Sequence, residues 1–135
     1  MSRRRKAREI ALQALYAVQL SSQDWEKALS ENVSRRHSSG EAVDYAEALV
    51  ERVVKESGKL DLMIEEVLEN WDFERISVVD LLILKIALVE LIHFPSTPKN
   101  VIINEAVEVA HRFSSKNAGE FVNGILDELA SRIRD

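Results

Sequence analysis

Apolar positions recur at helical spacing along most of the chain, and they are densest in the stretch from residue 76 to residue 94. Nearly every position from Val78 to Ile92 is apolar, and the exceptions are Asp80, Lys85 and Glu90. These charges are five residues apart, about 500° of helical rotation, so they point to different sides of a helix. Because a helix that is apolar all round is buried by its neighbours, this stretch predicts the central helix of an all-α domain.

Neither a membrane span nor a strand fits this stretch. A spanning helix needs roughly 18 or more residues with few charges, whereas this apolar run is shorter and carries charges of both signs. The run is also too long for a buried strand. Ser77 followed three residues later by Asp80 is typical of a helix N-terminus, which supports the helical interpretation.

The same periodicity predicts six further helices and no strand. They cover residues 3–20, 24–37, 41–57, 60–70, 98–113 and 117–133. The positions expected to face inward are Ala7, Ile10, Ala11, Ala14, Leu15 and Val18; Trp25, Ala28, Leu29, Asn32 and Val33; Val43, Ala46, Leu49, Val50, Val53 and Val54; Leu60, Ile64, Val67 and Leu68; Val101, Ile102, Ala106, Val109 and Ala110; and Ala118, Phe121, Val122, Ile125, Leu126, Leu129, Ala130 and Ile133.

Local signals set the expected ends of these helices. Gly58 is expected to close the third helix, and the fourth is expected to end near Asn70. Thr97 is expected to cap the helix that begins at Pro98. Capping boxes are expected at Ser38 with Glu41 and at Asn117 with Glu120.

Asn123-Gly124 would be typical of a hairpin turn between two strands. The apolar stripe of the last helix nevertheless continues straight through this dipeptide, so a helix is predicted. Gly124 then costs about 1 kcal/mol relative to alanine. We therefore expect a packing reason for it, such as the close approach of another helix.

The length of 135 residues fits one domain, and the helices are expected to form two packed bundles. The natural division lies between residues 1–58 and 59–135, which share one core. There are no cysteines, so neither a disulfide framework nor a thiolate metal site is expected. The basic N-terminus lacks the apolar segment of a secretory signal, which makes a cytoplasmic protein the default expectation.

Charge is distributed unevenly. The net charge is −5, yet five of the 18 basic residues lie within the first eight positions, which leaves 13 basic and 23 acidic side chains for the remainder. These five residues, called the basic arm below, are Arg3, Arg4, Arg5, Lys6 and Arg8. An acidic body with a basic arm suggests two partners of opposite charge.

Enzymatic and metal-dependent chemistry finds little support. The three histidines lie on different predicted elements, no two of them stand at metal-ligand spacing, and no cysteine could complete a site. No glycine-rich phosphate loop or nucleophile elbow is present. No enzyme activity, metal or cofactor is therefore expected.

The basic arm has two interpretations. A run of charges is often a solvated, disordered chain end. Alternatively it binds nucleic acid, because arginine pairs bidentately with phosphate and stacks on bases. The arm runs directly into a helix, which gives the arginines a fixed origin, and single-stranded RNA is the target that fits a chain without a groove-reading dimer motif.

Five segments of the chain resemble the NusB family of transcription antitermination factors in order and spacing. They are residues 4–9 (RRKARE), 11–16 (ALQALY), 84–91 (LKIALVEL), 103–110 (INEAVEVA) and 121–127 (FVNGILD). The resemblance covers nearly the whole chain. It implies an all-α fold of two helical bundles. It also implies binding of boxA-type single-stranded RNA together with NusE, a small-subunit ribosomal protein, in the RNA polymerase complex that transcribes ribosomal RNA operons.

The resemblance also implies site residues. For RNA it implies the arm residues Arg3, Arg4, Arg5, Lys6 and Arg8, and a second region at Phe113, Lys116, Asn117 and Glu120. Phe121 lies in that region too, but core packing is the preferred interpretation for it. Some relatives are acidic at the position of Asn117, so the uncharged amide implies a tighter contact with phosphate. For NusE it implies Tyr16, Glu74 and Asp80.

Three other interpretations compete with this one. The same fold occurs as the N-terminal domain of a ribosomal RNA cytosine methyltransferase, but this chain is too short to hold a cofactor-binding sheet as well. A helical adaptor that binds only protein would leave the arm idle. A homodimer that buries the arm would be an autoinhibited state.

Overall fold

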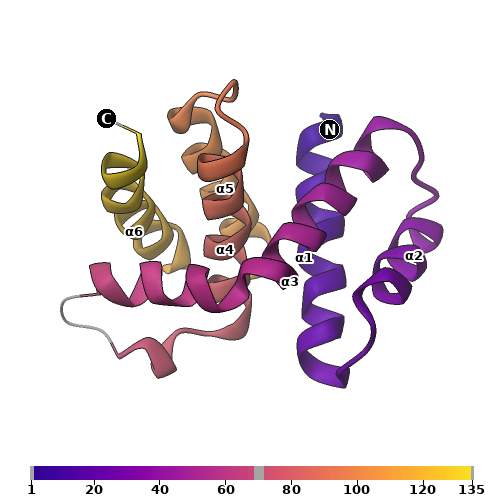
Figure 1. The fold of residues 1–135 in the computed structure, drawn as a ribbon, viewed down its shortest axis with the longest axis horizontal. Helices are drawn as coiled ribbons and strands as arrows, with labels where there is room; N and C mark the ends of the chain where they lie inside the picture. Colours follow the sequence, from indigo (N-terminus) through magenta and orange to yellow (C-terminus); the bar gives the residue numbers. More distant parts are fainter. Residues whose placement is uncertain (1, 69–71, 135) are drawn as a thin grey trace.

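The computed structural model describes residues 2–68 and 72–134, which form six α-helices and one short 3₁₀ helix without any strand (Figure 1). The elements are α1 (Arg3–Ser21), α2 (Trp25–Arg35), α3 (Glu41–Val67), η1 (Phe73–Arg75), α4 (Val78–His93), α5 (Lys99–Phe113) and α6 (Ala118–Ile133). The all-α prediction is confirmed, with one helix fewer than the seven expected.

Helix α4 is the centre of the fold, as its sequence predicts. All ten residues from Leu82 to Leu91 are buried, and α1, α3, α5 and α6 pack around them. Its N-terminus is also as expected, since the Ser77 hydroxyl accepts a hydrogen bond of 3.1 Å from the backbone N–H of Asp80. Each buried leucine or isoleucine of this helix contributes roughly 1.5–3 kcal/mol of transfer free energy.

Helix α3 is continuous where two helices were expected. It passes through Gly58 without interruption and ends at Val67, while the expected end near Asn70 lies outside the described residues. A glycine that closes a helix adopts positive φ, and in the described chain the one glycine with positive φ is Gly40. Gly58 thus keeps helical geometry, and the buried Leu60 and Ile64 carry the apolar stripe onward.

Two groups of helices lie side by side along α3 (Figure 1). One contains α1, α2 and the N-terminal half of α3, and the other contains α4, α5, α6 and the C-terminal half of α3. A single cluster of buried apolar side chains runs through all six helices. The boundary expected near residue 58 therefore falls inside one helix that both groups share.

Three expected caps are not formed. Gly40, at φ 69°, takes the N-cap position of α3, so the box of Ser38 with Glu41 is absent. Asn117 has helical backbone angles and makes no side-chain cap on α6, whereas a capping side chain needs an extended residue. Pro98, rather than Thr97, precedes the first residue of α5.

Packing also differs from expectation at three positions, Val54, Val101 and Gly124. Val54 and Val101, expected inside, are exposed. Gly124 is exposed and a Cβ there would meet no atom within 4 Å, so close helix approach does not explain this glycine. The close approach occurs at Gly119, where a Cβ would lie 2.8 Å from Cδ2 of the His111 ring.

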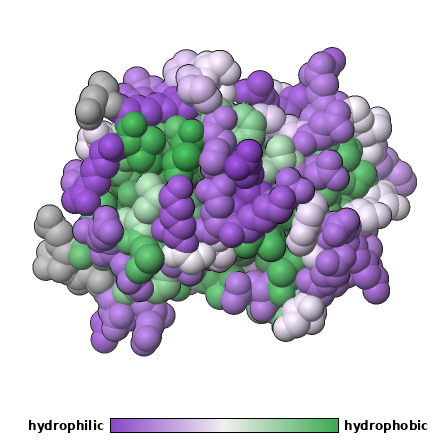
Figure 2. Space-filling model, viewed as in Figure 1, coloured by the Kyte–Doolittle hydropathy of each residue, from purple (hydrophilic) through white to green (hydrophobic). Residues whose placement is uncertain are grey.

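The molecular surface is largely hydrophilic on the face drawn in Figure 2, and its apolar areas are separated by polar side chains. Within residues 2–68 and 72–134, no helix combines the length and hydropathy that crossing a membrane requires.

Candidate nucleic-acid interface

The basic arm forms the first turns of α1 rather than a free chain end. Helix α1 begins at Arg3, and the Ser2 hydroxyl caps it by accepting a hydrogen bond of 3.1 Å from the backbone N–H of Arg5. Each arm side chain therefore leaves the helix in a fixed direction. This arrangement is the rigid origin that the sequence suggested.

Arg8, which the family resemblance implied as an RNA contact, is buried with 4% of its surface exposed. Its Nε and Nη2 donate to the two carboxylate oxygens of Glu90 over 2.8 and 2.7 Å. Glu90 itself is 1% exposed, in the middle of the apolar helix α4. A charge in such a place requires a partner, and this requirement draws Arg8 inward.

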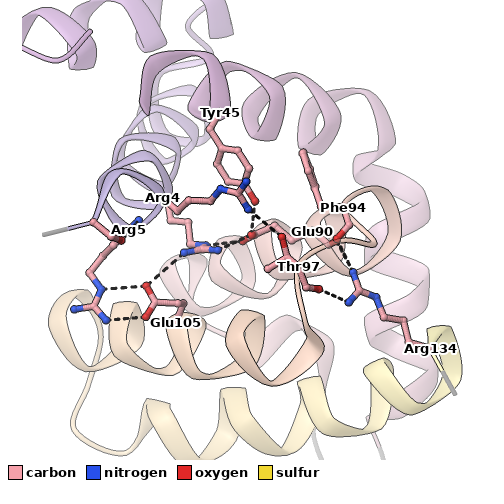
Figure 3. Close-up of polar contacts among 10 residues, drawn as sticks. Arg4, Arg5, Tyr45, Glu90, Phe94, Thr97, Glu105 and Arg134 are labelled. Carbon is pink, nitrogen blue, oxygen red and sulfur yellow. Dashed lines mark hydrogen bonds and ion pairs between the residues drawn. The ribbon is translucent and has the colours of Figure 1, made fainter. Parts of the chain in front are cut away.

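The Tyr45 hydroxyl completes this buried cluster by donating a hydrogen bond of 2.6 Å to Glu90 (Figure 3). Burial, and then the adjacent Glu90 carboxylate, raise the pKa of Tyr45 above its ordinary value. The phenol therefore stays protonated and remains a donor. Arg8, Glu90 and Tyr45 together join α1, α4 and α3.

Arg5 forms a second two-point pair, with Glu105 of α5. Its Nε and Nη2 donate to the carboxylate oxygens over 3.0 and 2.7 Å (Figure 3). Hydrogen bonding from Arg5 is the main cause that holds the pKa of Glu105 below its ordinary value, so this carboxyl stays ionised. The Arg5 side chain is still 40% exposed, unlike that of Arg8.

Of the remaining arm cations, Arg3 and Arg4 are exposed and Lys6 is half-buried. Arg4 donates from Nη1 to the hydroxyl of Thr97 over 3.0 Å, and its guanidinium carbon lies 4.6 Å from the centre of the Tyr45 ring. Arg3 makes an exposed pair with Glu41. The Lys6 ammonium makes no hydrogen bond or ion pair with the described residues. Arg3, Arg4 and Lys6, together with the half-exposed Arg5, thus supply the accessible positive charge of the arm.

The second expected RNA region lies where α5 ends and α6 begins. Phe113 is half-buried at the end of α5, while Lys116, Asn117 and Glu120 are exposed. Phe121 packs partly buried against the core, in line with the preferred interpretation. The side chains of Lys116 and Asn117 are therefore open to a ligand.

Helices α1 and α5 bring the two regions to one surface. The pairs Arg5–Glu105 and Glu9–Arg112 show that the helices run side by side in the same direction. Descending α1 from the arm therefore leads past Arg112 to Phe113 and the following loop. We call this line of contact the α1–α5 seam.

Glu9 and Arg112 were missed by the sequence reasoning. Glu9 is 1% exposed and receives ion pairs of 3.2 Å from both Arg112 and Arg36. The sequence did carry a signal that Glu9 faces other helices. Glu9 lies on the same helical face as Leu12 and Tyr16, which follow it by three and seven residues. Its arginine partners lie far along the chain, and no local spacing reveals them.

An open apolar groove of about 630 Å³ lies beside the seam. Tyr16 lines it and is 39% exposed. The other apolar lining residues are Leu12, Ala17, Leu20, Val79 and Phe113. Asp80 follows Val79 and accepts a hydrogen bond from the Ser114 hydroxyl.

Two of the three residues expected to bind NusE lie at this apolar groove. Tyr16 lines the groove directly. Asp80 does not line it but is next in the chain to Val79, which does, so Asp80 lies at the edge of the groove. Glu74 is exposed on η1, ahead of α4, and does not line the groove. Among the described residues, no group of three or more His, Cys, Asp or Glu side chains is arranged to hold a metal ion.

Comparison of the sequence with known proteins identifies the NusB family. The model of the NusB family matches residues 5–131. The transcription antitermination protein NusB of Geotalea uraniireducens is 43% identical, with 100% of this chain and 99% of that protein covered. The protein of the same name from Citrifermentans bemidjiense is 42% identical, with the same two shares covered.

Solved structures agree with the sequence relatives. T. maritima NusB superimposes with a TM-score of 0.90 at 32% identity, covering 98% of this chain and 93% of that one. A crystal structure described as antitermination factors NusB and NusE in complex with dsRNA gives a TM-score of 0.88 at 26% identity, and 98% of each chain is covered.

Proposed function

Because the chain belongs to the NusB family, we propose that it is a transcription antitermination factor that binds boxA-type single-stranded RNA together with NusE. In this role it joins the RNA polymerase complex and promotes transcription of ribosomal RNA. The family is one of antitermination factors, and the proposed activity is binding without catalysis or a cofactor. Such a role would place the protein in the cytoplasm, in line with an N-terminus that lacks the apolar segment of a secretory signal.

The observation that carries the RNA half of the proposal is the α1–α5 seam. Exposed cations of the arm lie at one end of it, and the exposed Lys116 and Asn117 follow its other end. Arginine and lysine at both ends would neutralise successive phosphates of one strand. Arg3, Arg4, Arg5 and Lys6 are the proposed arm contacts, and Phe113, Lys116, Asn117 and Glu120 the proposed contacts of the second region.

Arg8 has a different role in this proposal. Its guanidinium is occupied by Glu90 in the interior, so it supports the arm instead of meeting a phosphate directly. A variant that tests RNA binding should therefore leave Arg8 intact. The three substitutions Arg3→Gln, Arg4→Gln and Lys6→Gln remove three of the arm cations while keeping the pairs Arg5–Glu105 and Arg8–Glu90.

The groove beside the seam supports the NusE half. An aromatic side chain such as Tyr16 in a half-open apolar groove is typical of a protein-binding hot spot. Asp80 adds negative charge at its edge, which suits a basic ribosomal protein. Glu74, the third proposed NusE contact, lies outside the groove. Tyr16→Ala should weaken NusE binding about 10- to 100-fold, whereas Leu62→Ala, an exposed apolar residue of α3 outside the groove, should not.

The first experiment is fluorescence anisotropy of a labelled boxA-type RNA, with and without NusE, at several salt concentrations. We expect NusE to tighten binding, salt to weaken it, and the triple arm variant to lose it. Unlabelled single-stranded and double-stranded RNA of the same sequence serve as competitors, because one similar structure contains dsRNA.

The alternative is a helical adaptor that binds only protein. It predicts no sequence-preferring RNA binding under either condition, with NusE binding intact in the triple arm variant. A homodimer that hides the arm would instead make RNA affinity depend on protein concentration. Anisotropy at several protein concentrations, combined with light scattering, separates these outcomes.

A further inference from the structure

Arg112 is an exposed cation in an unusually fixed position. Its side chain is 56% exposed, yet Nη1 lies 3.2 Å from Oε2 of Glu9. The guanidinium carbon also lies 5.7 Å from the centre of the Phe113 ring. An arginine that is held at one edge and open at the other can offer its free N–H groups to a ligand at little cost in side-chain entropy.

Glu9 is the residue that fixes this cation. Its carboxylate is 1% exposed, and its second oxygen, Oε1, receives Nη1 of Arg36 at 3.2 Å. Arg36 is held in turn by the amide oxygen of Gln13 at 3.1 Å. Two arginines thus share one buried carboxylate, which leaves this cluster with one positive charge in excess.

The cluster of Glu9, Arg36 and Arg112 lies on the surface where the RNA strand is proposed to run. Arg5, Glu9, His111 and Arg112 line a shallow hollow of about 250 Å³ on the α1–α5 seam. The hollow includes an arm residue on one side, and Phe113 with its loop follows Arg112 on the other. The acidic Glu108 also lines the hollow, so the hollow is not a broad basic patch. Its positive charge available to a ligand comes chiefly from the exposed guanidinium of Arg112.

We propose that Arg112, held by Glu9, contacts an RNA phosphate between the arm and the Phe113–Asn117 loop. This inference rests on the proposed function and adds a residue to it. Phosphate has the geometry that the free edge of a guanidinium recognises. One strand would then run along the α1–α5 seam, meeting first the arm, next Arg112 and finally Lys116.

The test compares Arg112→Gln with Arg52→Gln in RNA anisotropy with NusE present. Arg52 is a matched control, since it is 50% exposed and has one carboxylate partner, Glu56, on α3. We expect Arg112→Gln to weaken binding about 5- to 10-fold and to lower the slope of log affinity against log salt by about 0.7, the value for one phosphate contact on a single strand. Arg52→Gln should change neither quantity.

Neutral methylphosphonate linkages, placed one at a time along the RNA, locate the contact. One neutral linkage should weaken RNA binding to the wild type but have no effect on binding to Arg112→Gln. Along the RNA, this linkage should lie between the linkage whose effect is lost in Arg4→Gln and the linkage whose effect is lost in Lys116→Gln. An indirect structural effect would weaken all RNAs equally and leave no such linkage, which would overturn the inference. If wild-type protein fails to bind the unmodified RNA, the proposed function fails instead.

Discussion

The guanidinium of Arg8 and the carboxylate of Glu90 face each other across two hydrogen bonds, of 2.8 and 2.7 Å, in the interior of the protein. The two residues are 82 positions apart in sequence, on α1 and α4. They divide the basic arm into two parts with different tasks. Arg8 holds α1 against the central helix, and the preceding cations remain available to a ligand.

Arg8→Ala should lower the free energy of unfolding by about 3–5 kcal/mol, because it leaves the Glu90 charge buried without its cationic partner. Urea unfolding at neutral pH measures this change. Arg3→Ala is the control, since its pair with Glu41 is exposed and should contribute less than about 1 kcal/mol. Equal effects of the two variants would contradict a structural role for Arg8.

Glu105→Gln should increase affinity for RNA about 3- to 10-fold at low salt, because it removes a negative charge that competes with phosphate for Arg5. RNA anisotropy measures the change, and the gain should shrink as salt rises. Glu128→Gln is a matched control, as Glu128 also pairs with an arginine but on α6. Weaker binding by Glu105→Gln would mean that Arg5 needs its carboxylate partner to be correctly oriented.

Stability should fall in acid partly through Glu105. Arg5 holds the pKa of this carboxyl below its ordinary value of 4.5, so the folded state binds its proton less readily than the unfolded state does. The stabilisation is therefore complete above the unfolded-state pKa and is lost as the pH falls through the lower, folded-state pKa. Hydrogen bonding from His93 lowers the pKa of Glu56 as well, which adds a contribution of the same sign.

Unfolding free energies of wild type and Glu105→Gln, measured between about pH 7 and pH 3, check this prediction. The wild type should be the more stable at neutral pH, and the difference should narrow as the acid limit is approached. A difference that stays constant across this range would show that the Glu105 charge contributes nothing to stability.

Gly58→Ala should stabilise the protein by about 0.5–1 kcal/mol, because Gly58 lies within a continuous helix and alanine restricts the unfolded chain. A Cβ there would meet no atom within 4 Å. The melting temperature should rise by about 2–5 °C. Gly40→Ala is the opposite control, since φ of 69° at Gly40 strains any other residue, and it should lower the melting temperature.

The sequence predicted α4 well because its pattern leaves no alternative. Ten consecutive buried residues cannot be placed anywhere but at the centre. The continuity of α3 was not predictable in the same way. Gly58 is a local signal for a helix end, and it is overridden by Leu60 and Ile64, whose burial depends on helices distant in the chain.

The candidate site was predictable in part for a similar reason. A run of cations is visible in any sequence, so the arm was recognised. Which arginine is buried depends on carboxylates such as Glu90 and Glu105, and their distance from the arm becomes known only when α4 and α5 are packed. The same holds for Arg112, whose partner Glu9 lies on another helix.

Thr97 accepts hydrogen bonds from both ends of the chain, at its hydroxyl from Arg4 and at its carbonyl oxygen from Arg134. Arg134 also donates to the carbonyl oxygen of Phe94 (Figure 3) and to those of Glu90 and Leu91, so its guanidinium caps the C-terminal end of α4. The loop between α4 and α5 is therefore a mechanical junction. A pulling force applied to the two termini would load this loop from both sides, together with the ion pairs of Arg3 and Arg5. We therefore expect the contacts of this loop to be among the first to break.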